Sequence, residues 1–151
     1  MPSSDVMFRP ARRDDVPAVI DLLADDVLGK ARESRDPQPY FAAFDQMQRE
    51  GANHLIVAGV GGLLVACYQI TFISGLSLTA TRRAQIEGVR VAASHRNQGL
   101  GQALIADAEI RARAAGCGLL QFTTNRSREN AHRFYARMGF TPSHIGYKKA
   151  L

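Results

Sequence analysis

The sequence predicts an α/β domain with a mixed central sheet and helices on both faces. Short apolar runs typical of strands alternate with longer segments of helical periodicity. Gly61 and Gly62 join two early strands in a two-residue hairpin, which makes that part of the sheet antiparallel. A later strand is followed by a glycine-bearing loop, a long helix and another strand, which predicts a parallel pair. With 151 residues, we expect a single domain over residues 1–151.

The first half of the chain carries the signals of two helices and three strands. A helix capped by Asp14 has an apolar stripe of Val16, Val19, Ile20, Leu23 and Val27. The other expected elements are a strand from Val6 to Arg9, a charged loop from Gly29 to Pro39, a helix marked by Tyr40, Phe41, Phe44 and Met47, and strands from His54 to Val60 and Leu63 to Ile73. Residues from Thr71 to Thr81 lack periodicity, which predicts a loop.

The second half continues the alternation. The expected elements are a strand that ends at Val91, a helix from Gln102 to Ala115, a strand from Leu119 to Thr124, a helix capped by Ser127 and a last strand within Phe140 to Lys149. Asp107 and Arg111 interrupt the apolar arc of the long helix. Because they stand four residues apart, we expect an ion pair between them, with no catalytic role.

The strand before the long helix contains a change of phase. Its apolar residues are Ala84 and Ile86, and then Val89 and Val91. Since side chains alternate with period two, a regular strand cannot bury both pairs on one face. A β-bulge at Gly88 restores a single buried face. Such a bulge also frees backbone groups from Val89 to Val91 for a ligand.

The loop after this strand has the features of an anion site. Arg96, Gly99 and Gly101 form an Arg-x-x-Gly-x-Gly pattern that opens directly into the long helix. A helix N-terminus offers unpaired N–H groups and a positive dipole end, and glycine lets a phosphate approach the backbone closely. The loop is not a Walker loop, because Gln102 follows Gly101 where that motif has lysine. It is not a dinucleotide fingerprint either, because Leu104 stands where that motif has its third glycine. An ordinary tight strand-to-helix turn is the alternative.

The helix after Ser127 holds two further candidates. Ala131, Phe134 and Met138 have the spacing of core residues. Asn130 is a poor residue inside a helix unless its amide has a partner. Tyr135 is either a candidate for function or a satisfied core tyrosine.

These two motifs together resemble the GCN5-related N-acetyltransferases, the GNAT family. The resemblance rests on the loop from Arg96 to Gly101 and on Asn130, Ala131 and Tyr135 with the following Gly139-Phe140. The motifs cover residues 84–140, and the order of elements fits nearly the whole chain. The resemblance implies a GNAT-type mixed central sheet with a bulged strand, acetyl-CoA as cofactor and an amine as acceptor.

The resemblance also implies roles for individual residues. The loop binds the pyrophosphate of acetyl-CoA, the bulged strand pairs with the pantetheine arm, the asparagine contacts the cofactor, and the tyrosine protonates the departing thiolate. The cofactor-binding residues are then Val89, Arg90, Val91, Arg96, Asn97, Gln98, Gly99, Leu100, Gly101, Gln102 and Asn130, and the acid is Tyr135. The chain departs from the family at Asn97-Gln98, where a glycine and a basic residue are common. Asparagine tolerates left-handed dihedral angles, so the turn is retained.

Acetyl transfer to an amine also needs a base. The amine is protonated near neutral pH and must lose a proton before it attacks. Glu87 precedes the bulge, where a carboxylate can act directly or through water; a solvated strand charge is the alternative. A backbone N–H near Val89 is the candidate to bind the tetrahedral oxyanion.

The acceptor is predicted less sharply. In this family the acceptor pocket is built largely from the first two helices, their connection and the neighbouring strands. Here that region carries the carboxylates of Asp21, Asp25, Asp26, Glu33, Asp36 and Glu87. Carboxylates near a pocket favour a cationic primary amine. Lys30, Arg32 and Arg35 make the charge of the connection mixed, and a solvated helix end is the alternative reading.

Composition narrows the remaining classes. The net charge of +5 makes nucleic-acid binding a function to consider. The basic residues are scattered, however, and form no platform with aromatic residues, which disfavours this function. Cys67 and Cys117 have no metal or disulfide spacing, so we expect no metal and a cytoplasmic protein. No secretion signal and no membrane segment is expected. The sequence is compatible with a homodimer. The alternative to an enzyme is a non-catalytic CoA-binding or regulatory module on the same fold.

Overall fold

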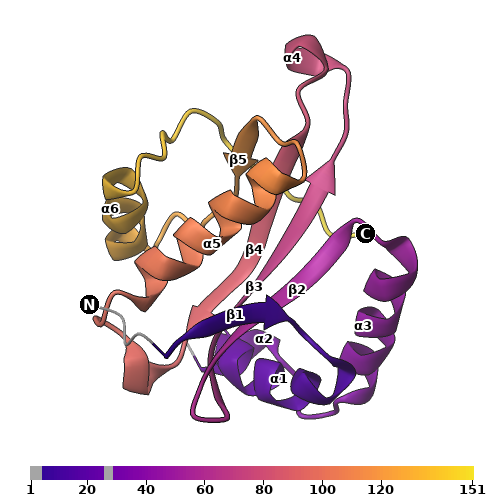
Figure 1. Cartoon of the computed structure of the whole chain (residues 1–151), viewed down its shortest axis with the longest axis vertical. Helices are drawn as coiled ribbons and strands as arrows, with labels where there is room; N and C mark the ends of the chain where they lie inside the picture. Colours follow the sequence, from indigo (N-terminus) through magenta and orange to yellow (C-terminus); the bar gives the residue numbers. More distant parts are fainter. Residues whose placement is uncertain (1–4, 26–28) are drawn as a thin grey trace. The chain divides into compact units, whose positions relative to one another are not determined.

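A five-stranded mixed sheet organises the first part of the chain (Figure 1). The computed structural model describes residues 5–25 and 29–151, which divide into two compact units, Met1–Gln121 and Phe122–Leu151. The strands of the first unit are β1 (Met7–Pro10), β2 (Asn53–Val60), β3 (Leu63–Ile73), β4 (Arg83–Val91) and β5 (Leu119–Gln121). They lie in sequence order; β1 to β4 are antiparallel, and β5 is parallel to β4. This confirms the predicted mixed sheet.

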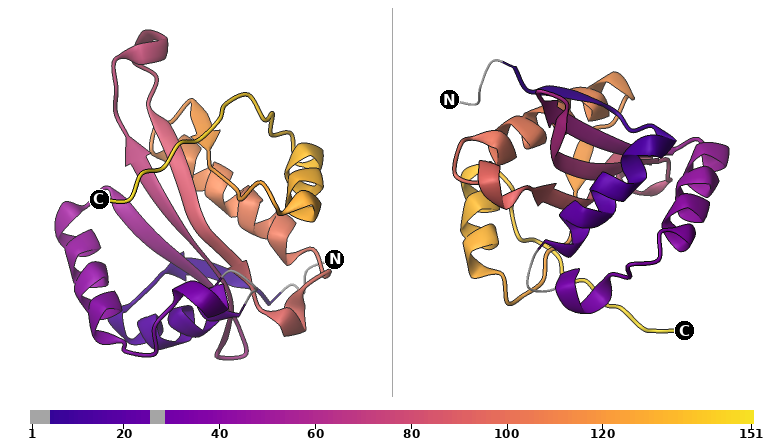
Figure 2. Two further views of the ribbon diagram at one scale, coloured as in Figure 1. Left: turned by 180° about the vertical axis from the view of Figure 1, so that it is seen from behind. Right: turned by 90° about the horizontal axis from the view of Figure 1, so that it is seen from below.

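Helices cover both faces of this sheet, as the alternation of elements predicts (Figures 1 and 2). The described helical segments of the unit are η1 (Arg13–Asp15), α1 (Val16–Ala24), α2 (Gly29–Arg32), α3 (Gln38–Glu50), α4 (Ser77–Ala80), η2 (Ala93–His95) and α5 (Leu100–Ala114). The helices α1 and α3 pack on one face, against β3, β4 and β2, and α5 packs on the other face, against β3, β4 and β5. The hairpin glycines Gly61 and Gly62 both have positive φ, as the predicted tight turn requires.

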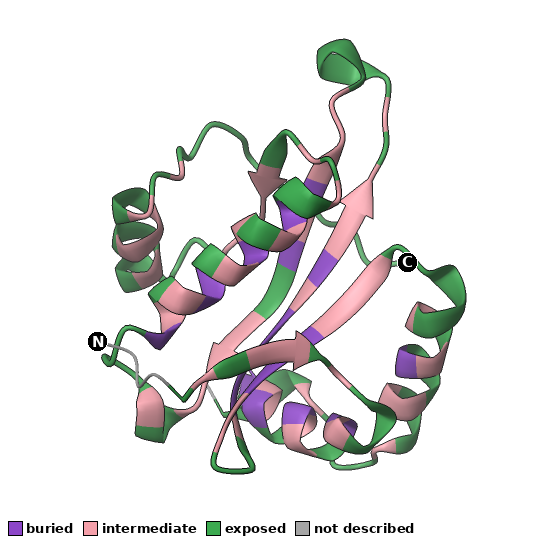
Figure 3. Ribbon diagram, viewed as in Figure 1, coloured by how far each residue is buried: buried purple, intermediate pink, exposed green. Residues whose placement is uncertain are grey.

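Two adjacent residues of β3 show how the core is divided between the faces. Cys67 lies in a buried cluster with Val19 and Leu22 of α1. Tyr68 is fully buried on the opposite face, where its hydroxyl donates a 2.5 Å hydrogen bond to Asp107 of α5. Buried residues line the inner sides of α1 and α5 (Figure 3). Both helices are therefore held to the sheet along their length.

The ion pair predicted within α5 is present and has a third partner. Arg111 Nε donates to Asp107 Oδ2 at 2.8 Å, so the i,i+4 prediction is confirmed. Arg111 also reaches the carbonyl of Phe8 in β1, at 3.4 Å. The pair thus connects α5 with two strands, Tyr68 being the contact in β3.

The start of the first helix differs from the prediction. Asp14 lies inside η1, and Asp15 is the N-cap of α1. The Asp15 carboxylate accepts hydrogen bonds from the Arg12 amide at 2.7 Å and from both terminal nitrogens of Arg9 at 2.7 and 3.0 Å. The hydrogen bonds with Arg9 lead the causes that lower the pKa of Asp15. The 3₁₀ turn η1 thus places the cap one residue later than predicted, and the Asp15 carboxylate bonds to Arg9 and Arg12 rather than to the amides of α1.

The two predicted loops of this unit contain single helical turns. In the segment from Gly29 to Pro39 the turn is α2, and between β3 and β4 it is α4. Leu78 and Thr79 of α4 have left-handed φ of 55° and 56°, so α4 is an irregular turn rather than a regular helix. The loop predicted from Thr71 is present only beyond Ile73, because Thr71 to Ile73 still pair with β4. Val27 of the predicted stripe lies outside the described residues.

The second unit contains α6 (Glu129–Arg137). The prediction that Ser127 caps this helix is wrong, because Arg128 is the cap residue. Both the amide and the hydroxyl of Ser127 donate to Asn125 Oδ1, at 3.0 and 2.7 Å. The Ser127 hydroxyl is therefore used in a local turn with Asn125.

The prediction of a last strand within Phe140 to Lys149 is also wrong. Residues 141–151 are exposed and have no regular secondary structure. Pro142 lacks the N–H group that a sheet ladder needs, and Gly146 offers no side chain to pack. Both residues disfavour a strand in this segment.

Candidate active site

The predicted β-bulge at Gly88 is present. Cys67 pairs with Arg90, whereas Gln69 pairs with Glu87, so two residues of β4 stand opposite one residue of β3. Gly88 has φ +58°, a conformation that L side chains rarely adopt. The glycine therefore permits the bulge that the change of phase predicts.

Packing holds the bulge from one face of the sheet. A Cβ atom placed on Gly88 would lie 3.6 Å from Leu23 Cδ2, so the end of α1 contacts the bulge. The Cys67 thiol lies 3.7 Å from the Gly88 carbonyl and donates to it. Burial raises the pKa of the Cys67 thiol to about 12, so the thiol stays protonated near neutral pH. This protonation disfavours Cys67 as a nucleophile.

The sheet forks next to the bulge. The pairing of β4 with β5 ends at Gln85 and Gln121, which face each other in the register. From Ile86 to Val91, no strand of the described residues pairs with the β5 side of β4. The stretch Val89–Val91, which the resemblance assigns to the pantetheine arm, lies in this part of β4, which is bonded to β3 but not to β5.

The loop beyond β4 has the predicted turn. Asn97 has φ +61° and Gly99 has φ +79°, so both residues are left-handed. Gly99 is the N-cap of α5, which begins at Leu100. Because the first N–H groups of a helix have no intrahelical acceptor, Leu100, Gly101 and Gln102 present amides at this end. The arrangement suits an anion.

Two side chains of the loop bind main-chain carbonyls. Gln98 Nε2 donates to the Ser94 carbonyl at 3.2 Å. Arg96 Nε donates to the Val91 carbonyl at 3.1 Å, and Arg96 Nη2 donates to the Asp25 carbonyl at 2.9 Å. The Arg96 guanidinium thus holds the end of β4 against the end of α1. Its assignment to phosphate stays a prediction.

Glu87 lies between the fork and the bulge. Ala84 and Ile86 are buried on one face of β4, whereas the other face carries the half-buried Gln85 and the exposed Glu87. Gln85 Nε2 donates to Glu87 Oε1 at 2.6 Å, and Gln121 Nε2 donates to Gln85 Oε1 at 3.0 Å. The carboxylate is therefore accessible and also held by a side-chain amide.

The sequence prediction missed Gln85 and Gln121 as neighbours of this carboxylate. The available signal was period two, since Gln85 and Glu87 stand on one face of the strand. Gln121 required the register of β4 and β5, which no local pattern contains.

Asn130 and Tyr135 lie in the second unit. Asn130 is exposed, and its Oδ1 accepts a hydrogen bond from Arg133 Nη2. The half-buried ring of Tyr135 lies 4.2 Å from the ring of Phe122 and 6.0 Å from that of Phe140, measured between centroids. The ring therefore belongs to an aromatic cluster, as the core interpretation of Tyr135 expects; its role as an acid stays a prediction.

The carboxylates predicted to face the acceptor have different partners. Glu33 Oε2 accepts a 2.5 Å hydrogen bond from the Tyr40 hydroxyl, and this bond is the main cause that raises the pKa of Tyr40. The Asp25 carboxylate lies 3.8 Å from Arg96 Nη2. Asp26 lies outside the described residues.

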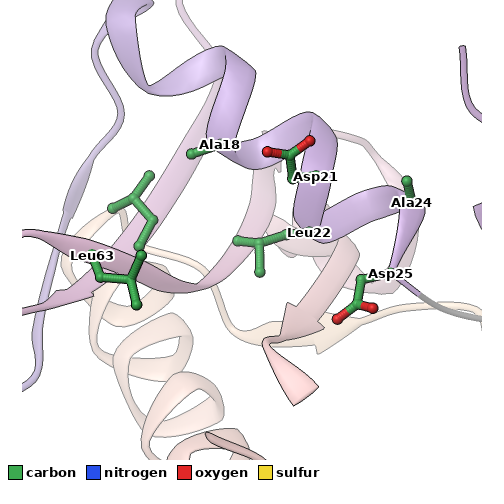
Figure 4. A pocket seen from close by; sticks show the side chains of 7 residues that line it. Ala18, Asp21, Leu22, Ala24, Asp25 and Leu63 are labelled. Carbon is green, nitrogen blue, oxygen red and sulfur yellow. The ribbon is translucent and has the colours of Figure 1, made fainter. Parts of the chain in front are cut away.

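A depression of about 480 Å³ lies beside α1 (Figure 4). Its lining residues come from α1, its C-cap and the start of β3: Ala18, Asp21, Leu22, Ala24, Asp25, Leu63 and Leu64. Neither Glu87 nor a loop residue lines it, so we do not assign it to the acceptor.

Within residues 5–25 and 29–151, no three His, Cys, Asp or Glu side chains are grouped to hold a metal ion. No helix of the same ranges is long and apolar enough to cross a membrane.

Known proteins resemble this chain at several levels. The sequence profile of the acetyltransferase (GNAT) family matches residues 17–140. The crystal structure of a transcriptional regulator from Bacillus halodurans C-125 is 40% identical and has a TM-score of 0.93, covering 97% of this chain and 99% of that chain. A protein from Agrobacterium tumefaciens str. C58, proposed to be an acetyltransferase, is 26% identical with a TM-score of 0.85, covering 96% and 99%.

A curated enzyme matches a shorter segment. The aminoalkylphosphonate N-acetyltransferase of Salmonella typhimurium LT2 is 43% identical over 67 residues, which is 44% of this chain and 44% of that protein. The match thus spans less than half of the enzyme.

Proposed function

The chain belongs to the acetyltransferase (GNAT) family, and from this premise we propose that it moves an acetyl group from acetyl-CoA to a primary amine. One observation carries the proposal. At Gln85 and Gln121 the sheet forks, and β4 continues without β5 through the bulge into a left-handed loop at the N-terminus of α5. This arrangement combines a strand edge that β5 does not cover with the end of a helix that suits an anion, and the two together suit a long cofactor with a pyrophosphate. The proposal treats residues 1–151 as one functional domain.

The residues at the fork and the loop fit such a cofactor. Backbone groups from Val89 to Val91 would hold the pantetheine arm, as an added strand is held. Amides from Gly99 to Gln102 would hold the pyrophosphate, which the helix dipole favours. Arg90, Arg96, Asn97 and Gln98 complete the proposed set in this unit, and the family resemblance adds Asn130 of the second unit. When bound, acetyl-CoA supplies an acetyl group activated as a thioester.

The proton transfers fall to two side chains. Glu87 would accept a proton from the amine, directly or through water, at an exposed carboxylate. Tyr135 would donate the proton of its hydroxyl to the leaving sulfur. A tyrosine hydroxyl has a reference pKa of about 10 and a thiol about 8.5, so the transfer is nearly balanced. The amide near Val89 would donate to the oxyanion.

We propose a small cationic primary amine as acceptor. The support is the carboxylate set of α1 and the following connection, with Glu87 on β4. Asp21 and Asp36 have no ion pair with a described residue, so their negative charge is available to attract a cation.

A second function is favoured by one observation. The 40% identical structure from Bacillus halodurans is described as that of a transcriptional regulator. A non-catalytic CoA-binding or regulatory module would keep the loop and the fork, but it would need no base beside the bulge. Glu87 and its hydrogen bond from Gln85 therefore favour the enzyme.

Turnover separates the two functions. Release of free CoA from acetyl-CoA is followed with polyamines, amino-acid amides and acidic amino acids, at low and moderate salt. The proposal expects release with cationic amines and a rate that falls as salt rises. Binding of acetyl-CoA without release for any amine would favour the regulatory module. Turnover with acidic acceptors alone would contradict the choice of acceptor.

A further inference from the structure

We propose that Gln85 and Gln121 are positioning residues that hold the Glu87 carboxylate at the fork between β4 and β5. The inference rests on the proposed function, in which Glu87 is the base. Three side chains form a single chain of hydrogen bonds, from Gln121 to Gln85 at 3.0 Å and from Gln85 to Glu87 at 2.6 Å.

The direction of the hydrogen bonds matters. A carboxylate only accepts, so Gln85 must present its NH₂ group to Glu87. Its amide oxygen then points to Gln121 and needs a donor, which Gln121 Nε2 provides. If Gln85 were flipped, its oxygen would face the Glu87 carboxylate and two acceptors would oppose each other. Gln121 therefore sets the orientation of the amide that holds Glu87.

The backbone positions make this chain of side chains a fixed element. Gln85 and Gln121 form the last facing pair before the fork, so the sheet ladder holds both main chains. Glu87 lies two residues further along β4, beyond the support of β5 and one residue before the bulge. Because Glu87 is exposed, its side chain would otherwise sample several rotamers. The Gln85 amide selects one of them.

The chain offers a matched control on the neighbouring strand. Gln69 of β3 faces Glu87 in the register and shares its face of the sheet. Among the described residues, the structure contains no hydrogen bond between the two side chains. Gln69 thus resembles Gln85 in type and nearness, but it lacks the contact.

Kinetics of the full-length protein test the positioning role. Gln85→Met keeps the size of the side chain and removes the amide. We expect kcat to fall about tenfold, with KM for acetyl-CoA unchanged, since a hydrogen bond to a charged group contributes on the order of 1.5 kcal/mol. Gln121→Met should lower kcat less, and Gln69→Met should leave it unchanged. In a Glu87→Gln background, Gln85→Met should cause no further loss.

A spectroscopic measurement without cofactor tests the contacts directly. In the ¹⁵N-labelled protein, the Gln85 side-chain amide resonance should shift in Glu87→Ala, and that of Gln121 should shift in Gln85→Met. An active wild type with normal kcat in Gln85→Met overturns the positioning role alone. So does an equal loss in the Glu87→Gln background. A wild type that releases no CoA with any amine overturns the proposed function and the positioning role with it, even where the resonances shift.

Discussion

Arg96 donates a 2.9 Å hydrogen bond to the main-chain carbonyl of Asp25, 71 residues earlier in the chain. The same guanidinium binds the Val91 carbonyl at 3.1 Å. The end of α1 is thereby tied to the end of β4, just before the loop that we assign to the cofactor. An arginine that the motif assigns to phosphate thus has a structural role as well.

Replacing Arg96 should lower the stability of the folded chain. For Arg96→Met we expect the free energy of unfolding to fall by about 1 kcal/mol, because a charged donor loses two carbonyl partners but is half-exposed. Urea denaturation measures the change. Arg113→Met is the control. Among the described residues the Arg113 side chain pairs only with Glu109, in an exposed contact, so this variant should change stability little. Equal stability of the Arg96 variant and the wild type would contradict the structural role.

The bulge depends on the backbone of Gly88. Gly88→Ala places a Cβ in a left-handed conformation, which costs about 1–2 kcal/mol, and relief of that strain should displace the bulge. We expect lower stability and lower kcat. Gly51→Ala is matched, because Gly51 also has positive φ, at +81°, with open space around it. Gly51→Ala should lose a similar amount of stability but keep the wild-type kcat. If the two variants had the same kcat, the bulge would have no role in catalysis.

Tyr68 should make stability depend on alkaline pH. Burial, followed by the hydrogen bond to Asp107, raises the pKa of the Tyr68 hydroxyl. Below pH of about 10, the hydroxyl is neutral in both the folded and the unfolded chain, and its contribution is complete. Above that pH the unfolded chain ionises first, so the free energy of unfolding falls by up to about 1.4 kcal/mol per pH unit.

The variant Tyr68→Phe isolates this effect. At pH 8 it should be less stable than the wild type, because Asp107 loses a buried donor. The difference in the free energy of unfolding between the two proteins should narrow between pH 10 and pH 11. The wild type loses stability there as Tyr68 ionises in the unfolded chain, whereas the variant has no hydroxyl to ionise. Denaturation at each pH measures it, and a constant difference would show that Tyr68 ionises equally in both states.

The variant Tyr135→Phe distinguishes two possible roles of Tyr135, that of a general acid and that of a core residue. Tyr135→Phe keeps the ring beside Phe122 and removes only the hydroxyl. If the hydroxyl is the general acid, kcat should fall about 100- to 10,000-fold while acetyl-CoA still binds. Full activity would mean that Tyr135 serves the aromatic cluster and that water protonates the thiolate.

Local patterns predicted the bulge and the loop because each depends on a few adjacent residues. The change of phase at Gly88 marks the bulge, and Asn97 and Gly99 permit the left-handed turn. Local patterns misplaced the Ser127 cap, because Ser127 binds Asn125 instead of the helix. They also predicted a last strand, although Pro142 disfavours one.

Contacts between distant segments could not be predicted in the same way. Asp107 and Arg111 are four residues apart, so their ion pair follows from helix geometry. Tyr68, the third member, lies 39 residues from Asp107 and needs the packing of α5 on β3. The contact of Gln85 with Gln121 likewise needs the register at the fork.

Calorimetric titration with acetyl-CoA tests whether the loop at the N-terminus of α5 binds the cofactor. The wild type should bind acetyl-CoA saturably. Gly101→Val should bind at least about tenfold more weakly with an unchanged thermal midpoint, because its side chain blocks the approach of the pyrophosphate to the backbone. Ala43→Val, on the exposed side of α3, should bind as the wild type does. A folded Gly101→Val protein with wild-type affinity would mean that this loop does not hold the pyrophosphate, and a wild type that does not bind would mean that acetyl-CoA is not its cofactor.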